Sequence, residues 1–322
     1  MEQQRRRAEE SGEPAPGREV LAVSTLERRA LCHGGPLVTV LGFGALEIGR
    51  DWGLGEGQRR RRPEAETAAS VLHAVLDLGL NLIDTASAYH QSEARIGDAV
   101  HSRRSEFVLA SKCGEHSSEP GTYYDFSHDA IRDSILRSRE LLQTSVIDLM
   151  QIHFGPNPER VLDEGETVRA MREAQDAGHV RFLGASCPNH LATRCIRMGC
   201  FQVLQLDYSL LNRSAEQAIH EAHAAGIGVL LRGPLAGGWL TPRAAETSAQ
   251  NPAMQARLRP YHDLVGQEGA RLTALGMAFC ARHPGVSSML VGTKSVEHLR
   301  ANVQACREGV PADILEAAER LR

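Results

Sequence analysis

Short runs of apolar, often β-branched residues alternate with amphipathic helical patterns along most of the chain. The predicted strands are the run that ends at Gly44 and residues 80–84, 107–111, 146–153, 180–184, 203–206, 227–231 and 289–292. The predicted helices cover 64–78, 92–102, 127–143, 165–177, 189–199, 214–225, 266–282 and 296–306. Alternating strands and helices indicate a parallel sheet that is buried on both faces. Eight repeats predict an α/β fold with a closed (β/α)8 TIM barrel, and a doubly wound open sheet is the alternative.

The alternating pattern of strands and helices begins only after residue 27 and then continues as one domain. Residues 1–27 are charged, contain two prolines and show no apolar period, so we expect a flexible N-terminal tail followed by a single barrel domain over 28–322. Two short extended runs flank Gly34 and Gly35 and predict a hairpin before the first barrel strand.

Two connections, 114–126 and 236–264, are too long to be simple turns. Both follow predicted strands, so in a barrel they lie as long βα loops at the C-terminal face, where active sites are built. We expect these loops and Trp52 to bound a substrate. The run Arg59–Arg62 has no interleaved aromatic residues and is interpreted as a solvated loop rather than a nucleic-acid site.

Composition and charge indicate which cellular compartment, partners and metal sites to expect. The chain has 322 residues and a formal net charge of −4, and it has neither an apolar run of about 18 residues nor an apolar segment behind its N-terminal arginines. We therefore expect a cytoplasmic protein with no membrane or nucleic-acid partner. The seven cysteines are scattered without a C-x-x-C pair, which indicates neither a disulfide framework nor a metal site. The oligomeric state is left open.

Polar residues stand at the ends of three consecutive predicted strands: Asp84, Lys112 and His153, with Tyr89 in the loop after Asp84. Polar groups at the carboxyl ends of barrel strands point into the site. An ammonium at Lys112 is expected to lower the pKa of the Tyr89 phenol, and Asp84 to keep Lys112 protonated. His153 is expected to offer a ring N–H that polarises a carbonyl oxygen. The four residues together predict a site that protonates an oxygen.

The sequence resembles the aldo-keto reductase superfamily from about Leu37 to Asn302. The resemblance rests on eight motifs in order: LGFGAL (41–46), NLIDTASAYHQSEARIG (81–97), ASKCG (110–114), IDLMQIH (147–153), GHVRFLGAS (178–186), QLDYSLLNR (205–213), RGPLAGGWLT (232–241) and VGTKSVEHLRAN (291–302). It implies a βα barrel, and it places the family's catalytic Asp, Tyr, Lys and His on Asp84, Tyr89, Lys112 and His153. It also implies an NAD(P)H-linked oxidoreductase that acts on small carbonyl or alcohol substrates.

By the same resemblance a nicotinamide cofactor lies extended across the barrel mouth. The residues implied to bind it are Gly44, Ala45, Asp84, Ser186, Gln205, Arg232, Pro234, Leu235, Gly237, Lys294, Ser295, His298 and Asn302. Of these, Ser186 and Gln205 would hold the carboxamide, and Lys294 beside a helix N-terminus suits a phosphate. Lys112 and Lys294 are the only lysines in the chain, among 36 basic residues. NADP(H) is preferred to NAD(H) on the strength of Lys294.

Two other functions stay open at this point. One is a nicotinamide-binding sensor of the same fold with little turnover. The other is a Schiff-base lyase that uses Lys112, a chemistry that barrel lysines also support.

Overall fold

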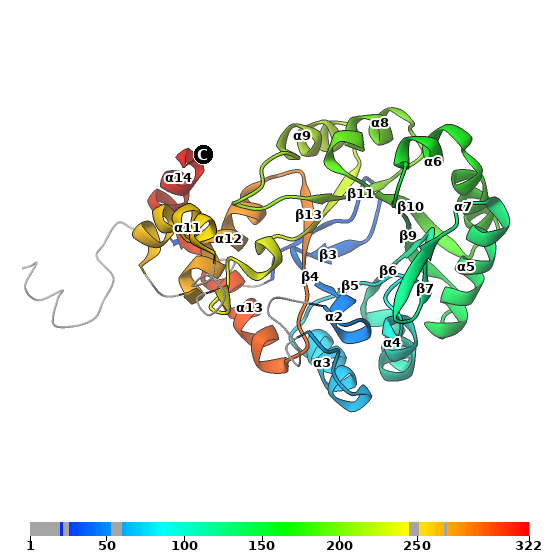
Figure 1. Ribbon diagram of the computed structural model, residues 1–322, viewed down its shortest axis with the longest axis horizontal. Helices are drawn as coiled ribbons and strands as arrows, with labels where there is room; N and C mark the ends of the chain where they lie inside the picture. The colour runs from blue at the N-terminus through cyan, green and yellow to red at the C-terminus, as the bar shows by residue number, and fades with distance from the viewer. Residues whose placement is uncertain (1–19, 22–25, 53–59, 245–250, 267–268, 322) are drawn as a thin grey trace, which may run out of the picture.

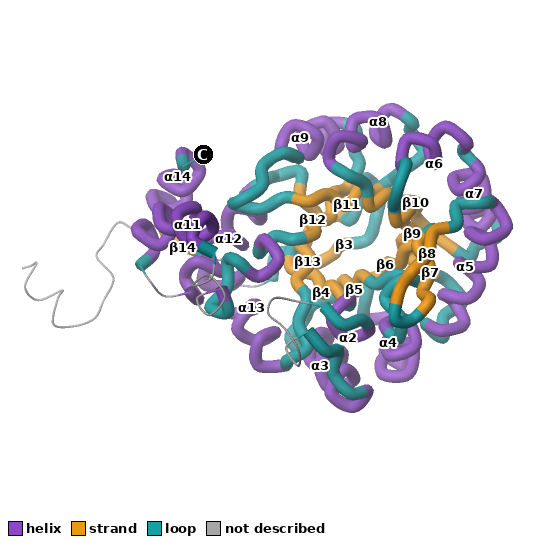
Figure 2. Tube along the Cα trace, in the orientation of Figure 1, coloured by secondary structure: helices purple, strands orange, loops and turns teal. Residues whose placement is uncertain are grey.

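Eight parallel strands close into a barrel in the computed structural model, which describes residues 20–21, 26–52, 60–244, 251–266 and 269–321 (Figures 1 and 2). The strands are β4 (Leu41–Gly44), β5 (Leu82–Asp84), β6 (Val108–Cys113), β9 (Ile147–His153), β10 (Val180–Ser186), β11 (Val203–Asp207), β12 (Gly228–Arg232) and β13 (Val286–Val291). They pair in this order, and β13 closes the ring by pairing with β4. The predicted TIM barrel is confirmed, and the doubly wound open sheet is wrong.

Helices surround the barrel on its outer side (Figure 2). Those near the predicted positions are α3 (Ala65–Asp77), α4 (Ser92–Val100), α5 (His128–Leu141), α7 (Glu166–Asp176), α8 (Ala192–Arg197), α9 (Glu216–Ala224), α12 (Gly269–Arg282) and α13 (Val296–Glu308). Their apolar faces pack on the outside of the sheet and form the main hydrophobic core. Among the described residues, no helix has the length and apolarity needed to cross a membrane.

The hairpin predicted before the first barrel strand is present, and it closes one end of the barrel. It consists of β2 (Arg28–Ala30) and β3 (Leu37–Thr39). Leu31 and Val38 from this hairpin belong to a second core inside the barrel, with Leu82, Val108, Ala110, Leu149, Val203, Leu230 and Leu290. A Cβ on Gly228 would lie 1.6 Å from the Leu31 carbonyl oxygen, so the hairpin docks this closely only because residue 228 is glycine. The carboxyl ends of the strands remain for the site.

The two long connections carry elements that the sequence analysis did not predict. Residues 114–126 contain a hairpin of β7 (Glu115–Ser118) and β8 (Gly121–Tyr124), which stands in front of β6 and β9 in Figure 1. Residues 236–264 begin with the short η4 (Ala236–Gly238) and include most of α11 (Pro252–Val265). Residues 245–250 lie outside the described residues.

Seven further elements complete the described fold: α2 (Leu46–Gly49), η2 (His101–Glu106), α6 (Pro158–Glu164), η3 (Asn189–Leu191), α14 (Ala312–Arg320) and the paired strands β1 (Val20–Leu21) and β14 (Val310–Pro311). Most of the predicted tail, residues 1–19 and 22–25, lies outside the described residues. Val20 and Leu21 form antiparallel pairs with Pro311 and Val310, so the segment predicted as a tail includes one strand.

Candidate active site

A buried ion pair lies at the carboxyl ends of β5 and β6. Lys112 is fully buried and Asp84 is almost fully buried. The Lys112 Nζ donates to Asp84 Oδ2 at 2.5 Å and to the Thr85 carbonyl oxygen at 2.9 Å. Burial lowers the pKa of Lys112, but the negative charge of Asp84 and hydrogen bonds to Asp84 and Tyr89 outweigh it, and the pKa is raised. The ammonium is therefore held in its charged form.

The second oxygen of Asp84 links the pair to the opposite wall of the barrel. Asp84 Oδ1 accepts from Gln151 Nε2 and from Gln205 Nε2, each at 2.9 Å. Ser186 Oγ donates to Gln205 Oε1 at 3.1 Å, and Arg232 donates to Ser186 Oγ at 2.9 Å. Ser186, Gln205 and Arg232 lie on three different strands and were implied as cofactor residues by the family resemblance. The structure joins them with Asp84 into one hydrogen-bonded network.

Tyr89 lies over this ion pair. Its ring centroid is 5.1 Å from Lys112 Nζ. Burial raises the pKa of the Tyr89 phenol, and the charge of Lys112 only partly opposes that effect. Lys112 lowers this pKa as expected, but burial outweighs the ammonium and the pKa is raised on balance. The phenol is protonated at neutral pH and can donate a proton.

His153, the last residue of β9, packs edge-on against Tyr89. The two ring centroids are 5.8 Å apart and the ring planes are at 86°. Its Nδ1 lies 2.9 Å from Glu115 Oε2. Burial and the charge of Lys112 lower the pKa of His153 although Glu115 raises it. The lowered pKa favours the neutral ring, which has a single N–H, and the expected role of this N–H in polarising a carbonyl oxygen stays a prediction.

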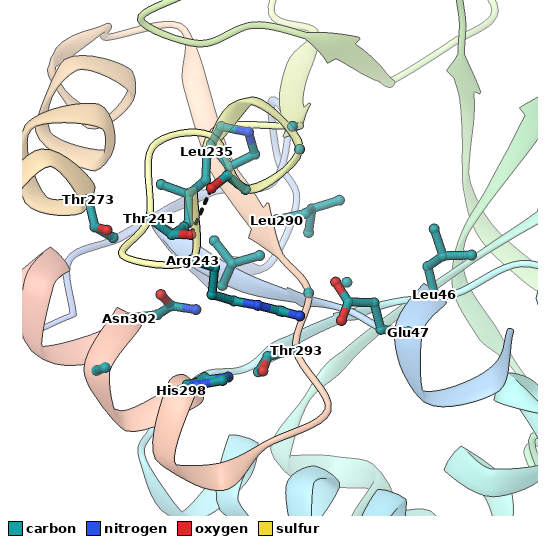
Figure 3. Close-up of a pocket in the computed structure, with 18 of the residues that line it drawn as sticks. Leu46, Glu47, Leu235, Thr241, Arg243, Thr273, Leu290, Thr293, His298 and Asn302 are labelled. Atoms are coloured by element: carbon teal, nitrogen blue, oxygen red, sulfur yellow. Dashed lines mark hydrogen bonds between the residues drawn. The ribbon is translucent and has the colours of Figure 1, made fainter. Parts of the chain in front are cut away.

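A cavity of about 330 Å³ extends from Asp84 and Tyr89 toward α13 (Figure 3). Seven of the predicted cofactor residues line it: Gly44, Asp84, Pro234, Leu235, Gly237, His298 and Asn302. Trp52, expected at the substrate boundary, also lines it and is half exposed. The cavity therefore joins the ion pair to the last βα unit of the barrel.

The other predicted cofactor residues lie outside the described cavity lining. Ala45 is fully buried, and its backbone N–H donates to the Asp84 carbonyl oxygen at 2.8 Å, so it supports the strand end. Ser186, Gln205 and Arg232 belong to the network behind the cavity. Ser295 is the N-cap of α13 and its Oγ accepts from the His298 backbone N–H at 3.3 Å. Lys294 Nζ donates to the Arg61 carbonyl oxygen at 2.6 Å.

Two charged cavity residues were missed by the sequence analysis. Glu47 on α2 and Arg243 lie on opposite sides of the cavity, and the Arg243 side chain extends toward Glu47 (Figure 3). Burial raises the pKa of Glu47, and the charges of Arg243 and Lys294 oppose it. Asp84 was predicted because polar residues at the carboxyl ends of barrel strands point into the site. Neither Glu47 nor Arg243 ends a strand, so this argument could not identify them.

Gln151 and Glu115 were also missed. Gln151 lies two residues before His153 on the same strand, and alternate strand residues share a face, so this spacing was an available signal. Glu115 lies in a segment predicted as a loop, and its contact with His153 depends on the unpredicted hairpin.

Comparison with known proteins gives the family. The family model described as "Aldo/keto reductase family" matches residues 40–321. This chain belongs to the aldo-keto reductase family. It is an oxidoreductase with the (β/α)8 barrel of its relatives, and members of this family use nicotinamide cofactors.

Individual relatives of this aldo-keto reductase are moderately similar over most of their length. YhdN, an aldo-keto reductase of Bacillus subtilis, is 31% identical over 81% of this chain and 85% of its own. L-galactose dehydrogenase of Arabidopsis thaliana is 28% identical over 89% of this chain and 90% of its own. The holo form of an aldo-keto reductase from Bacillus halodurans superposes with a TM-score of 0.75 at 26% identity, covering 92% of this chain and 96% of that one.

The cavity fits a nicotinamide dinucleotide. Its lining includes Gly44, Gly233 and Gly292, where the absence of side chains lets a ligand approach the backbone. Glu47 Oε2 is buried and has no hydrogen-bond partner among the described residues, and a sugar hydroxyl is the kind of donor that would satisfy it. The lining is therefore compatible with an extended ligand that carries sugar groups.

Proposed function

We propose that this aldo-keto reductase transfers a hydride between NADP(H) and a small aldehyde, ketone or corresponding alcohol, with Tyr89 as the proton donor. The observation that carries the proposal is the chain of contacts from Asp84 through Lys112 to Tyr89 at one end of the cavity. We further propose that it acts in the cytoplasm on small molecules.

Each residue of this chain has one task in the proposed mechanism. In reduction, Tyr89 donates its phenolic proton to the carbonyl oxygen, and the Lys112 ammonium stabilises the phenolate that results. Asp84 keeps Lys112 charged and in place. In oxidation, the phenolate accepts the proton of the alcohol. The nicotinamide, when bound, supplies or accepts the hydride at the substrate carbon.

The residues proposed to hold the cofactor fall into two groups. Ser186, Gln205 and Arg232 would contact the carboxamide end, with Gly44, Ala45 and the segment from Pro234 to Gly237 along the cavity. Lys294, Ser295, His298 and Asn302 would receive the adenosine end. The preference for NADP(H) rests on the positive charge of Lys294 itself, which contacts the Arg61 main chain and has Arg243, Glu47 and Asp51 as charged neighbours.

The Schiff-base alternative conflicts with the surroundings of Lys112. A lysine nucleophile needs a lowered pKa and an accessible amine. Lys112 has a raised pKa, no exposed surface and hydrogen bonds to Asp84 and Thr85.

A titration of bound-nicotinamide fluorescence with NADPH and with NADH, followed by a panel of aldehydes and ketones, tests the proposal. We expect tighter binding of NADPH and multiple turnover with at least one carbonyl compound. Equal affinity for the two cofactors contradicts the NADP(H) preference. Binding with slow release and no multiple turnover contradicts the proposed reaction and favours a sensor.

A further inference from the structure

Gln151 reaches the active-site ion pair from the strand next to Lys112. It lies on β9, is paired in register with Lys112 on β6, and is fully buried. Its Nε2 donates to Asp84 Oδ1 at 2.9 Å. The residue paired with it on β10 is Gly184, where a Cβ would lie 3.0 Å from Gln151 Cγ. The absence of a side chain at position 184 therefore leaves room for the long side chain that reaches Asp84.

The stability of the fold does not explain an amide at position 151. Gln151 Oε1 is buried and has no hydrogen-bond partner among the described residues. A buried acceptor without a partner destabilises a fold, whereas an apolar side chain of similar length has no polar atom to satisfy. Within the described part of the chain, the hydrogen bond of this side chain goes to Asp84. The amide therefore points to a role at the ion pair.

The groups that contact the carboxylate of Asp84 are all hydrogen-bond donors. Lys112 Nζ lies 2.5 Å from Oδ2, and the amides of Gln151 and Gln205 both donate to Oδ1 at 2.9 Å. A proton on either oxygen would displace one of these donors. Hydrogen bonds to the charged form favour that form. The two amides thus oppose transfer of a proton from Lys112 Nζ to Asp84 Oδ2, which would turn the buried ion pair into a neutral amine and a neutral acid.

The two amides differ in what else they are expected to bind. Gln205 Oε1 accepts from Ser186 Oγ at 3.1 Å, and both residues are proposed to contact the carboxamide of the cofactor. A contact with the carboxamide competes with the contact between Gln205 and Asp84. Gln151 has no proposed contact with the cofactor. It is therefore the donor that stays on Asp84 while the cofactor is bound.

Other ionisable groups face the ion pair from several elements. Tyr89 and His153 interact with both members of the pair. Glu93 on α4 interacts with its ammonium, and Glu115 on β7 interacts with Tyr89. These groups are the same in the wild type and in a variant at position 151. A difference between the two proteins therefore reports on Gln151.

We propose that Gln151 is a positioning residue that holds Asp84 as the unprotonated counter-ion of Lys112. The lysine then stays an ammonium when the Tyr89 phenolate forms beside it. This inference rests on the proposed function. Because the ammonium stabilises the phenolate and does not hold the substrate, loss of the amide should lower kcat and leave KM nearly unchanged.

Gln151→Met tests the proposal, because it keeps the length of the side chain and removes the amide. In alcohol oxidation with NADP+, kcat should rise with pH as the Tyr89 phenolate forms. We expect this rise to move to higher pH by about one pH unit in the variant, which is about a tenfold lower kcat at a given pH along the rise. The KM for the alcohol should stay within about twofold of wild type.

The matched control is Gln202→Met, which removes an amide just before β11. Gln202 Oε1 accepts from the Leu183 backbone N–H at 2.8 Å, and its Nε2 donates to the Cys200 carbonyl oxygen at 3.2 Å. This variant should lose stability and keep the wild-type pH profile. An unchanged profile in Gln151→Met overturns the proposal. If that variant does not fold, Gln151→Asn replaces it, since its amide stops one carbon short of Asp84, and the same displacement is expected.

NMR of the lysine side chains tests the charge directly, because Lys112 and Lys294 are the only lysines in the chain. In the full chain labelled with 15N-lysine, Lys294→Met assigns the two signals. We expect Lys112 to be an ammonium at pH 7 in the wild type and to lose its proton at a lower pH in Gln151→Met. A neutral Lys112 in the wild type at pH 7 overturns the proposal even where no variant folds, and so does an equal titration in the two proteins.

The outcomes also separate this inference from the proposed function. The absence of turnover with every carbonyl compound and alcohol would contradict the proposed function. The titration of Lys112 would still decide whether Gln151 keeps the ion pair charged.

Discussion

Asp84 and Lys112 form an ion pair from which almost all solvent is excluded, and this makes each of them costly to change alone. Replacing Asp84 with Asn leaves the buried Lys112 ammonium without its counter-charge. We expect Asp84→Asn to lower the free energy of unfolding by about 3 to 5 kcal/mol. Urea denaturation measures this loss. The matched control is Asp163→Asn, which breaks the exposed pair with Arg194 and should cost less than about 1 kcal/mol. Similar losses in the two variants would contradict the assigned role.

A substitution of Lys294 tests the proposed preference for NADP(H) over NAD(H). Replacing it with Met removes a cation next to the adenosine end and keeps the length of the side chain. We expect the Kd for NADPH to rise about tenfold, with little change for NADH, because a charge-assisted hydrogen bond contributes about 1.5 kcal/mol or more. Fluorescence titration gives both constants. Equal losses for the two cofactors would place Lys294 away from the 2′-phosphate.

At the residue scale, strand ends made part of the site predictable. Asp84, Lys112 and His153 terminate or nearly terminate apolar runs, and the barrel brings strand ends together. Glu115 and Glu47 escaped prediction because each reaches the site from a short element outside the regular strand and helix pattern. Their roles depend on hairpin and helix placement, which apolar periodicity does not encode.

At the element scale, α2 packs against the loop that carries Tyr89. A Cβ on Gly49 would lie 2.3 Å from the Tyr89 carbonyl oxygen and 2.4 Å from the Ser92 backbone nitrogen. We expect Gly49→Ala to displace this loop, lower the free energy of unfolding by about 1 to 3 kcal/mol and reduce kcat. Gly121→Ala on β8 is the control, since its Cβ would meet its nearest neighbour at an ordinary 3.6 Å. Normal stability and turnover in Gly49→Ala would show that the loop is not held by this contact.

The packing of α4 on β6 predicts a dependence of stability on pH. Glu93 on α4 is buried and accepts from Ser111 Oγ at 2.5 Å. Burial raises the pKa of Glu93 from 4.5 to about 7, against the opposing effect of its hydrogen bonds. Between these values the unfolded chain releases a proton that the folded chain keeps, so stability falls as the pH rises.

Glu93→Gln mimics the protonated carboxyl group and removes this dependence. Compared with wild type, we expect the variant to gain about 2 to 3 kcal/mol of unfolding free energy between pH 5 and pH 8. Denaturation curves at both pH values measure it. A constant difference between the two proteins would mean that Glu93 is ionised in the folded state.

At the scale of the whole molecule, the hairpin of β2 and β3 closes one end of the barrel and the site occupies the other. The alternation of apolar runs and helical patterns predicted this barrel because both faces of each strand are buried. It missed the hairpin of β7 and β8, whose sequence lacks apolar alternation. It also missed α11, which lies largely in the connection 236–264 that was interpreted as a long loop. Pro252 occupies the first turn of this helix, where proline is tolerated.

The most direct test of the account compares the wild type with Tyr89→Phe, following NADPH oxidation with the best carbonyl substrate and cofactor binding by fluorescence. Removing the proton donor should lower kcat by a factor of about 10² to 10⁴. Because the ring is kept, the Kd for NADPH should stay within about twofold of wild type. A variant that keeps wild-type turnover would contradict the central claim that Tyr89 protonates the substrate oxygen.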